Sequence, residues 1–302
     1  MSVVSIHNPN SGFFSCCSIK LFDIVEFLRI TNKYPKSVDS SQMFSIYKNN
    51  KNRDISYDYF ENYNNIKVKK MKIMSELCFN PLINTGNYSH IDYEKLNPII
   101  KKYFYPSKRV LEKVNFLKNK YSIITDNCIA VYYRGTDKRK ETTIGSFDDF
   151  FYGIKKVIDQ NQTKSIIIQS DALDFIDFIK KKNLRNTIFI SENVCSRTNL
   201  GIHNEQTPSQ NYNQMFNLFA TFLILSDCKY IVCNSGNCSL WMMLFRGNNN
   251  NTLQFLNDKW YTSNIDIMLD LLPMGNNDLD MCVNIEHFRK KMKKKVKKNF
   301  KK

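Results

Sequence analysis

The stretch that decides the fold is CIAVYYRGTDK, residues 128–138. Its first six residues are all apolar and include no turn former, which predicts a buried strand over 128–133. The strand ends abruptly, because RGTDK, residues 134–138, follows it without a spacer. Such a change predicts either a solvated surface turn or a site that holds an anion.

Further strands and helices alternate around this stretch. Apolar runs predict strands over 165–169, 187–191, 229–233 and 252–256, and helical periodicity predicts helices over 146–159, 172–182, 211–226 and 238–246. Upstream, the same patterns predict a strand over 2–7, a helix that ends at Pro35, and helices over 93–106 and 107–121. Strands that alternate with helices predict an α/β fold whose parallel sheet carries helices on both faces.

The positive charge of the chain is concentrated at its end. Lys and Arg number 44 against 28 Asp and Glu, a net charge of +16 over 302 residues. Residues 289–302 hold ten basic and no acidic residues, so the other 288 positions carry only +6. The high isoelectric point therefore does not by itself predict that the body of the protein binds nucleic acid.

The cysteines and the N-terminus indicate the compartment. Nine cysteines occur without the paired spacing of a disulfide-rich module, so we expect reduced thiols. The first residues lack the pattern of a secretory signal, and the longest apolar run, 215–225, is too short to span a bilayer. These features predict a cytoplasmic protein. We also expect no metal site, because the Asp-x-Asp pair at 278–280 does not follow a core strand.

Three predicted strand ends carry unusual chemistry. They hold residues 134–138, then Asp171, then the segment 233–238. The chain has only nine glycines, yet two of them stand at these strand ends. The turn at 235–237 would aim free backbone N–H groups and a helix dipole at an anion, and Arg134 would add a planar fork suited to phosphate oxygens. Together these features predict a diphosphate site made without a metal.

A family resemblance appears once these motifs are taken in order. VYYRGTDK, IIIQSD and LSDCKYIVCNSGNCSLWMMLFRG, within 128–247, resemble three successive motifs of the fucosyltransferase superfamily, which includes the α1,6-, α1,2- and protein O-fucosyltransferases. The first is closest to the Arg-Arg-Thr-Asp-Lys form of the α1,6 enzymes. The resemblance implies a GT-B architecture, with two Rossmann-like domains whose mostly parallel sheets are flanked by helices. It implies an acceptor-side domain over 1–125, a nucleotide-sugar-binding domain over 126–275, and a C-terminal segment with the basic tail over 276–302.

The resemblance also implies roles for individual residues. Arg134 would contact the β-phosphate, Asp171 would face the nucleoside, and the donor would be bound by Arg134, Thr136, Asp137, Lys138, Asp171, Ser235, Gly236 and Asn237. The chain departs from the family at Tyr132, where a histidine is usual, and at Gly135, where a second arginine stands. The acidic residue of many relatives is missing from 219–222, which reads Phe-Ala-Thr-Phe. These departures leave the identity of the donor open.

The resulting functional hypothesis is a metal-independent inverting glycosyltransferase, with GDP-fucose as donor and a glycan or protein hydroxyl as acceptor. Its catalytic residues would be Arg134 and, as acceptor base, Glu141, with His7 and Asn10 as further candidates on the acceptor side. The alternative is a non-catalytic relative that binds a GDP-sugar or a glycan. For single residues, the alternatives are a surface pair of Arg134 with Asp137, a helix cap for Asp171, and solvated positions for Glu141 and His203.

The basic tail has a hypothesis of its own. Phe288, Met292, Val296 and Phe300 recur every four residues among lysines, a pattern that predicts a basic amphipathic helix. Such a helix would make weak contact with an anionic membrane or with RNA. The alternatives are a disordered solubilising end, or a tail that is the primary functional element with the body as its scaffold.

Overall fold

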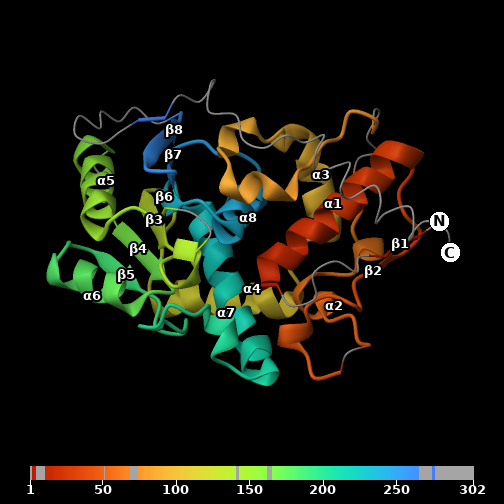
Figure 1. The fold of residues 1–302 in the computed structure, drawn as a ribbon, viewed down its shortest axis with the longest axis horizontal. Helices are drawn as coiled ribbons and strands as arrows, with labels where there is room; N and C mark the ends of the chain where they lie inside the picture. Colours follow the sequence, from red (N-terminus) through yellow and green to blue (C-terminus); the bar gives the residue numbers. More distant parts are fainter. Residues whose placement is uncertain are drawn as a thin grey trace.

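The computed structural model describes residues 2–4, 11–50, 52–68, 74–140, 143–161, 165–264 and 274–275 (Figure 1). The helices are α1 (Phe13–Thr31), α2 (Ser56–Tyr59), α3 (Tyr93–Tyr103), α4 (Lys108–Lys120), α5 (Phe147–Asn161), α6 (Leu173–Lys181), α7 (Pro208–Asp227) and α8 (Asn237–Arg246). The strands are β1 (Val3–Val4), β2 (Val38–Asp39), β3 (Cys128–Tyr133), β4 (Ser165–Ser170), β5 (Thr187–Phe189), β6 (Tyr230–Asn234), β7 (Thr252–Leu256) and β8 (Lys259–Ser263).

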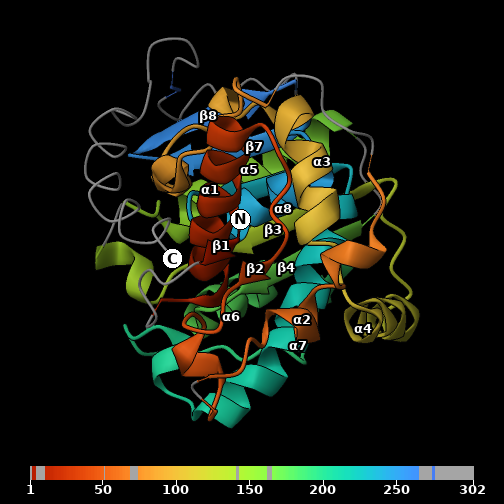
Figure 2. The ribbon, with the colours of Figure 1, turned by 90° about the vertical axis from the view of Figure 1, so that its right-hand side faces the viewer.

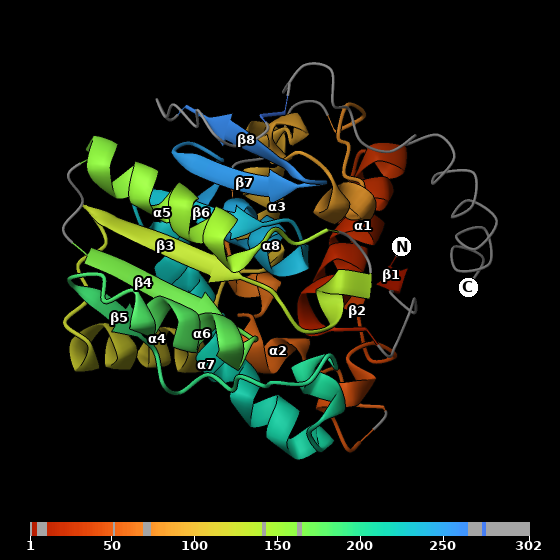
Figure 3. The same ribbon diagram turned by 60° about the vertical axis from the view of Figure 1, so that its left-hand side comes forward.

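A six-stranded sheet organises the C-terminal half in the order β5-β4-β3-β6-β7-β8. All neighbouring pairs from β5 to β7 are parallel, and β8 runs antiparallel to β7. The predicted α/β class with a mostly parallel sheet is thus confirmed. In Figure 3 the carboxyl ends of the parallel strands point toward α1, so the loops that follow these strands face the N-terminal half.

The alternation of side chains along β3 divides the core in two. Ile129, Val131 and Tyr133 pack with α5 and α6 on one face of the sheet. Cys128, Ala130 and Tyr132 belong to a larger cluster on the other face. That larger cluster includes α7 and α8 and extends into the N-terminal half. The core is divided in two because successive side chains of a strand point to opposite faces of the sheet.

The N-terminal half packs against the sheet through α1. Figure 2 shows α1 and α3 in front of the sheet, with the two-stranded parallel sheet of β1 and β2 beside α1. Helix α1 is buried around almost its whole circumference, since it lies between this half and α8. The Trp241 indole nitrogen of α8 donates a hydrogen bond to Ser18 Oγ of α1 at 3.0 Å, and its ring stacks on Phe14.

The sequence analysis left two parts of the fold undescribed. It predicted a strand over 252–256 and none after it, but β8 follows after a turn of only Asn257 and Asp258. Both turn residues have positive φ, 49° and 61°, which matches the tight hairpin turn that Asn and Asp favour. Residues 41–92, which gave no clear pattern, contain α2 and several short 3₁₀ turns. Among the described residues, no helix has the length and apolar character needed to cross a membrane.

Candidate active site

The sheet order places the site. Strands β3 and β6 are neighbours, and the chain winds outward from them in opposite directions, so their carboxyl ends form the crevice where such sheets bind ligands. Asn234, at the end of β6, joins the two strand ends. Its side-chain oxygen accepts from the Arg134 N–H at 2.9 Å, and its amide nitrogen donates to the Arg134 carbonyl at 2.8 Å. The backbone of Arg134 is therefore fixed by an asparagine that the sequence analysis missed.

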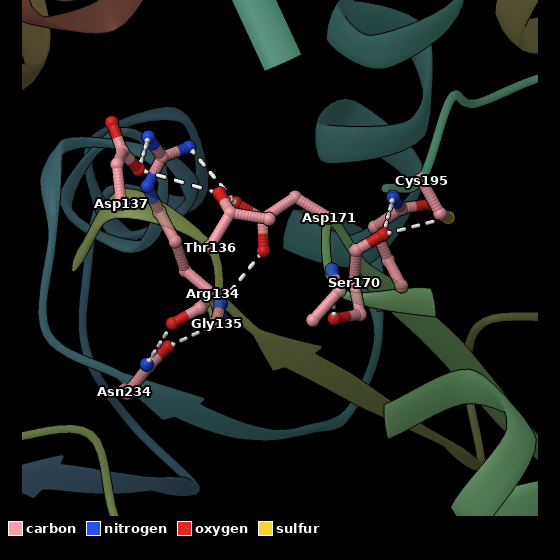
Figure 4. A network of polar contacts seen from close by, with 10 residues as sticks. Arg134, Gly135, Thr136, Asp137, Ser170, Asp171, Cys195 and Asn234 are labelled. Atoms are coloured by element: carbon pink, nitrogen blue, oxygen red, sulfur yellow. Dashed lines mark hydrogen bonds and ion pairs between the residues drawn. The ribbon is translucent and has the colours of Figure 1, made fainter. Parts of the chain in front are cut away.

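Asp171, at the end of β4, organises the loop that follows β3 (Figure 4). One carboxylate oxygen accepts from the Gly135 N–H at 2.7 Å, and the other accepts from the Thr136 hydroxyl at 2.6 Å. The side chain of Thr136 is only 2% exposed, and it does not line the cavity described below. Asp171 and Thr136 thus hold the loop in shape, a role different from the predicted direct contact of Thr136 with a donor.

The Arg134 guanidinium lies between two carboxylates. Its NH2 group is 2.6 Å from Asp137 Oδ1, and its NH1 group is 3.6 Å from Asp171 Oδ2. Burial opposes the charge, but the two carboxylates hold the pKa of Arg134 well above its ordinary value. The predicted pair with Asp137 exists, yet both side chains are only 21% exposed, so it is not a solvated surface pair. Arginine carries five N–H donors, and these contacts leave some of them for a ligand.

The turn after β6 corrects one prediction. Ser235 and Gly236 were expected to offer free N–H groups to an anion, and this is wrong. The Ser235 N–H and hydroxyl both donate to the Phe255 carbonyl at 3.0 Å. The Gly236 N–H donates to the Tyr88 hydroxyl at 2.9 Å, and this hydroxyl donates back to the Gly236 carbonyl at 2.9 Å.

A segment of the N-terminal half, residues 86–88, is tied to the same turn. The Gln254 side chain of β7 donates to the Gly86 carbonyl at 2.7 Å and accepts from the Tyr88 N–H at 3.0 Å. Together with the bonds between Tyr88 and Gly236, these contacts anchor residues 86–88 to β7 and to the turn after β6. The Gly236 N–H is therefore closed by a residue 148 positions away in the sequence, whereas the Ser235 N–H is closed by the neighbouring strand β7.

The start of α8 keeps part of the predicted anion site. Among the described residues, no acceptor is found for the backbone N–H of Asn237 or Cys238, the first two residues of the helix. Lys138 lies beside them, because its Cε is 3.5 Å from where a Cβ on Gly236 would stand. The Lys138 side chain is buried. A cation and a helix N-terminus therefore share one wall of a cavity.

This cavity has a volume of about 520 Å³ and lies between the two halves of the chain. Its floor carries Arg134, Asp137, Lys138 and Asp171, and the first turn of α1 forms the opposite wall. A third wall comes from the segment 193–218, which includes the first half of α7. The cavity therefore brings together Arg134, Asp137, Lys138, Asp171 and Asn237 of the predicted site.

Asn193 contributes a buried acceptor to the third wall. Its amide nitrogen donates to Gln169 Oε1 at 2.7 Å and to Thr221 Oγ1 at 2.8 Å. Gln169 donates its own amide to the Ser170 carbonyl, and the Thr221 hydroxyl donates to the Asn217 carbonyl, so both must accept from Asn193. The orientation of the Asn193 amide is thereby fixed, and its Oδ1 is left without a partner among the described residues.

His203 is placed differently from the expectation of a surface residue. It belongs to a short 3₁₀ turn, Ile202–Asn204, lines the cavity and is only partly exposed. The buried Asn211 side chain donates one hydrogen bond to the His203 carbonyl at 2.8 Å and another to the Ile46 carbonyl at 3.0 Å. Three further predicted residues, His7, Asn10 and Glu141, lie outside the described residues, as do 276–302.

The comparisons with known proteins identify the fold. No family model matches the sequence, and no curated protein does either. Among solved structures, the NodZ α-1,6-fucosyltransferase soaked with GDP-fucose matches with a TM-score of 0.52 and 9% identity, over 84% of this chain and 95% of that one. The chain has the fold of a fucosyltransferase.

Two further NodZ structures agree with this assignment. Fucosyltransferase NodZ from Bradyrhizobium matches with a TM-score of 0.52 and 9% identity, over 84% of this chain and 96% of that one. NodZ co-crystallised with GDP matches with a TM-score of 0.50 and 10% identity, over 85% and 96% of the two chains. The GT-B fold that the resemblance implied is confirmed.

Proposed function

We propose that the protein is a metal-independent inverting glycosyltransferase that moves fucose from GDP-fucose to a hydroxyl of a glycan or protein. One observation carries this proposal: Arg134, Lys138 and the start of α8 converge on a cavity at the switch point of the sheet. NodZ, whose fold the chain shares, was soaked with GDP-fucose and co-crystallised with GDP.

The charges of this wall suit the chemistry. When the bond between the sugar and the diphosphate breaks, negative charge grows on the β-phosphate. Arg134 and Lys138 stand where they would stabilise that charge, and they are held in place before a ligand arrives. Asp137 and Asp171 oppose the approach of an anion, but they also orient the guanidinium. We expect the diphosphate to replace part of the contact between Arg134 and Asp137.

The third wall favours a guanine base. Asn193 Oδ1 can only accept a hydrogen bond, and burial makes an acceptor without a donor costly by about 1–3 kcal/mol. Guanine presents an N–H and an NH₂ group side by side, whereas adenine presents an acceptor nitrogen at the same place. Gln206 and Gln214, which also line the cavity, each carry a buried side-chain oxygen without a partner among the described residues. These oxygens lie beneath the surface of the cavity, so a base rich in donors would pair with them after the side chains of this wall shift.

The test is thermal stabilisation by nucleotides, followed by turnover. GDP should raise the melting temperature more than ADP or UDP does, because the proposed base contacts favour guanine. A ligand at a hundred times its Kd adds about 2.7 kcal/mol of stability, which sets the size of the expected shift. Asn193→Leu, which removes the acceptor oxygen, should lose the preference for GDP. If none of the three nucleotides stabilises the protein, the proposal is wrong.

A non-catalytic GDP-sugar or glycan-binding protein is the second candidate. The closed turn favours this candidate, because the N–H groups of Ser235 and Gly236 donate to acceptors within the protein and so do not bind a phosphate. Release of fucose from GDP-fucose, to water or to an acceptor, separates the two candidates. A binding protein would be stabilised by GDP and would release no sugar.

A further inference from the structure

A transferase of the proposed kind needs a group that accepts the proton of the acceptor hydroxyl. Among the described residues that line the cavity, the only carboxylates are Asp137 and Asp171. Both are committed: Asp137 pairs with Arg134, and Asp171 accepts from the loop backbone and from Thr136. Neither is placed to take a proton without releasing the loop that holds Arg134. Among the described residues that line the cavity, the one other conventional base is the imidazole of His203.

His203 lies where the two halves of the chain meet. Its Cε1 is 3.9 Å from where a Cβ on Gly12, just before α1, would stand. A Cβ on Gly201 would lie 2.8 Å from the same carbon and 2.7 Å from Asp137 Oδ2, so the imidazole and this carboxylate are neighbours. Any side chain on Gly201 would collide with both groups. Glycine at this position thus allows the close approach of His203 to Asp137.

The surroundings of His203 keep its ring neutral. Burial first, and then the Arg134 charge, lower the pKa of His203 below its ordinary value of 6.5, while Asp137 and Asp171 oppose this effect. The described residues of the adjoining segment that line the cavity, 11–15, Ser18 and Ile19, carry no charge. Of the other titratable groups in the cavity, Tyr47, Tyr132 and Cys238 stay protonated, because burial raises the pKa of each. Lys138 adds a second positive charge on the floor.

We propose that His203 is the general base that takes the proton from the acceptor hydroxyl. This inference rests on the proposed function. The hydroxyl oxygen forms a bond to the anomeric carbon of the sugar, and its proton passes to an imidazole nitrogen. The bond from that carbon to the β-phosphate oxygen breaks, and its electron pair leaves on GDP beside Arg134. The neighbouring Asp137 carboxylate stabilises the imidazolium, which then returns the proton to solvent.

The experiment compares His203→Gln with His90→Gln, which makes the same change at an exposed histidine outside the cavity. Both variants should keep the stabilisation by GDP, because the proposed role of His203 is to take a proton from the acceptor hydroxyl and includes no bond to the nucleotide. His203→Gln should lower the turnover of GDP-fucose by about 10²-fold, and His90→Gln should leave it unchanged. Because the pKa of His203 is lowered, the wild type should keep its activity to a pH below 6.5 and lose it on further acidification, and this acid limb should vanish in His203→Gln. His203→Phe, which keeps a ring in the same space, is the second variant if His203→Gln folds poorly.

The outcomes separate the two proposals. If GDP does not stabilise the wild type, the proposed function itself fails. If GDP stabilises all variants but His203→Gln and His203→Phe retain wild-type turnover with its acid limb, the role of His203 is overturned and the proposed function stands. A wild type that binds GDP but turns over no GDP-fucose, with or without an acceptor, also overturns the role of His203.

Discussion

Replacing Thr136 by valine would test whether Asp171 holds the loop after β3. The hydroxyl lies 2.6 Å from a carboxylate oxygen and is 2% exposed, so its bond to an ionised group is worth about 1.5–3 kcal/mol. A methyl group cannot sit that close to oxygen, so the carboxylate must also move. We therefore expect Thr136→Val to lower the free energy of unfolding by about 3 kcal/mol, near the upper end of that range. Urea titration followed by circular dichroism would measure this loss.

Thr252→Val is the matched control for this substitution. Thr252 is also 2% exposed, but its hydroxyl makes only long contacts, 3.4 Å to the Asn250 carbonyl and 3.5 Å to Met243 Sδ. It lies in β7, where valine is a good strand former, so we expect a loss below about 1 kcal/mol. Thr136→Ser, which keeps the hydroxyl, should recover most of the stability. Equal losses in Thr136→Val and Thr252→Val would refute the reasoning.

Three further predictions concern the donor site and the tail. Arg134→Lys should lower turnover on the order of 10²-fold and weaken GDP binding less, because lysine keeps the charge but loses the planar fork; wild-type turnover in a well-folded Arg134→Ala protein would contradict this. Turnover should survive EDTA, because Arg134 and Lys138 supply the charge at the diphosphate, and loss that Mn²⁺ restores would count against the proposal. Removal of 289–302 should leave stabilisation by GDP intact and abolish salt-sensitive adsorption to anionic liposomes or RNA; lost GDP binding would place the tail in the fold.

The sequence predicted what local patterns determine. The strands of the large sheet were found because each is a short apolar run between turn formers, and Arg134 was found because it directly follows such a run. The hairpin to β8 was missed, although Asn257 and Asp258 between two apolar runs favour this kind of turn.

The remaining errors come from contacts between distant segments. Whether the Gly236 N–H is free depends on Tyr88, a residue 148 positions away, and no local pattern reports such a partner. Asn193 and His203 stood in a stretch without periodicity, so nothing in the sequence distinguished them from surface residues. Their positions in the cavity follow from the sheet order, which brings the segment after β5 to the same edge as the end of β3.

The hydrogen bonds that anchor residues 86–88 have a mechanical consequence. Four of them join Tyr88 and Gly86 to Gly236 and Gln254. Residues 86–88 and the turn before α8 therefore move as one body, because parting them would break all four bonds together. A ligand that displaces the start of α8 would pull this N-terminal segment with it, although Tyr88 and Gly236 lie 148 positions apart in the chain.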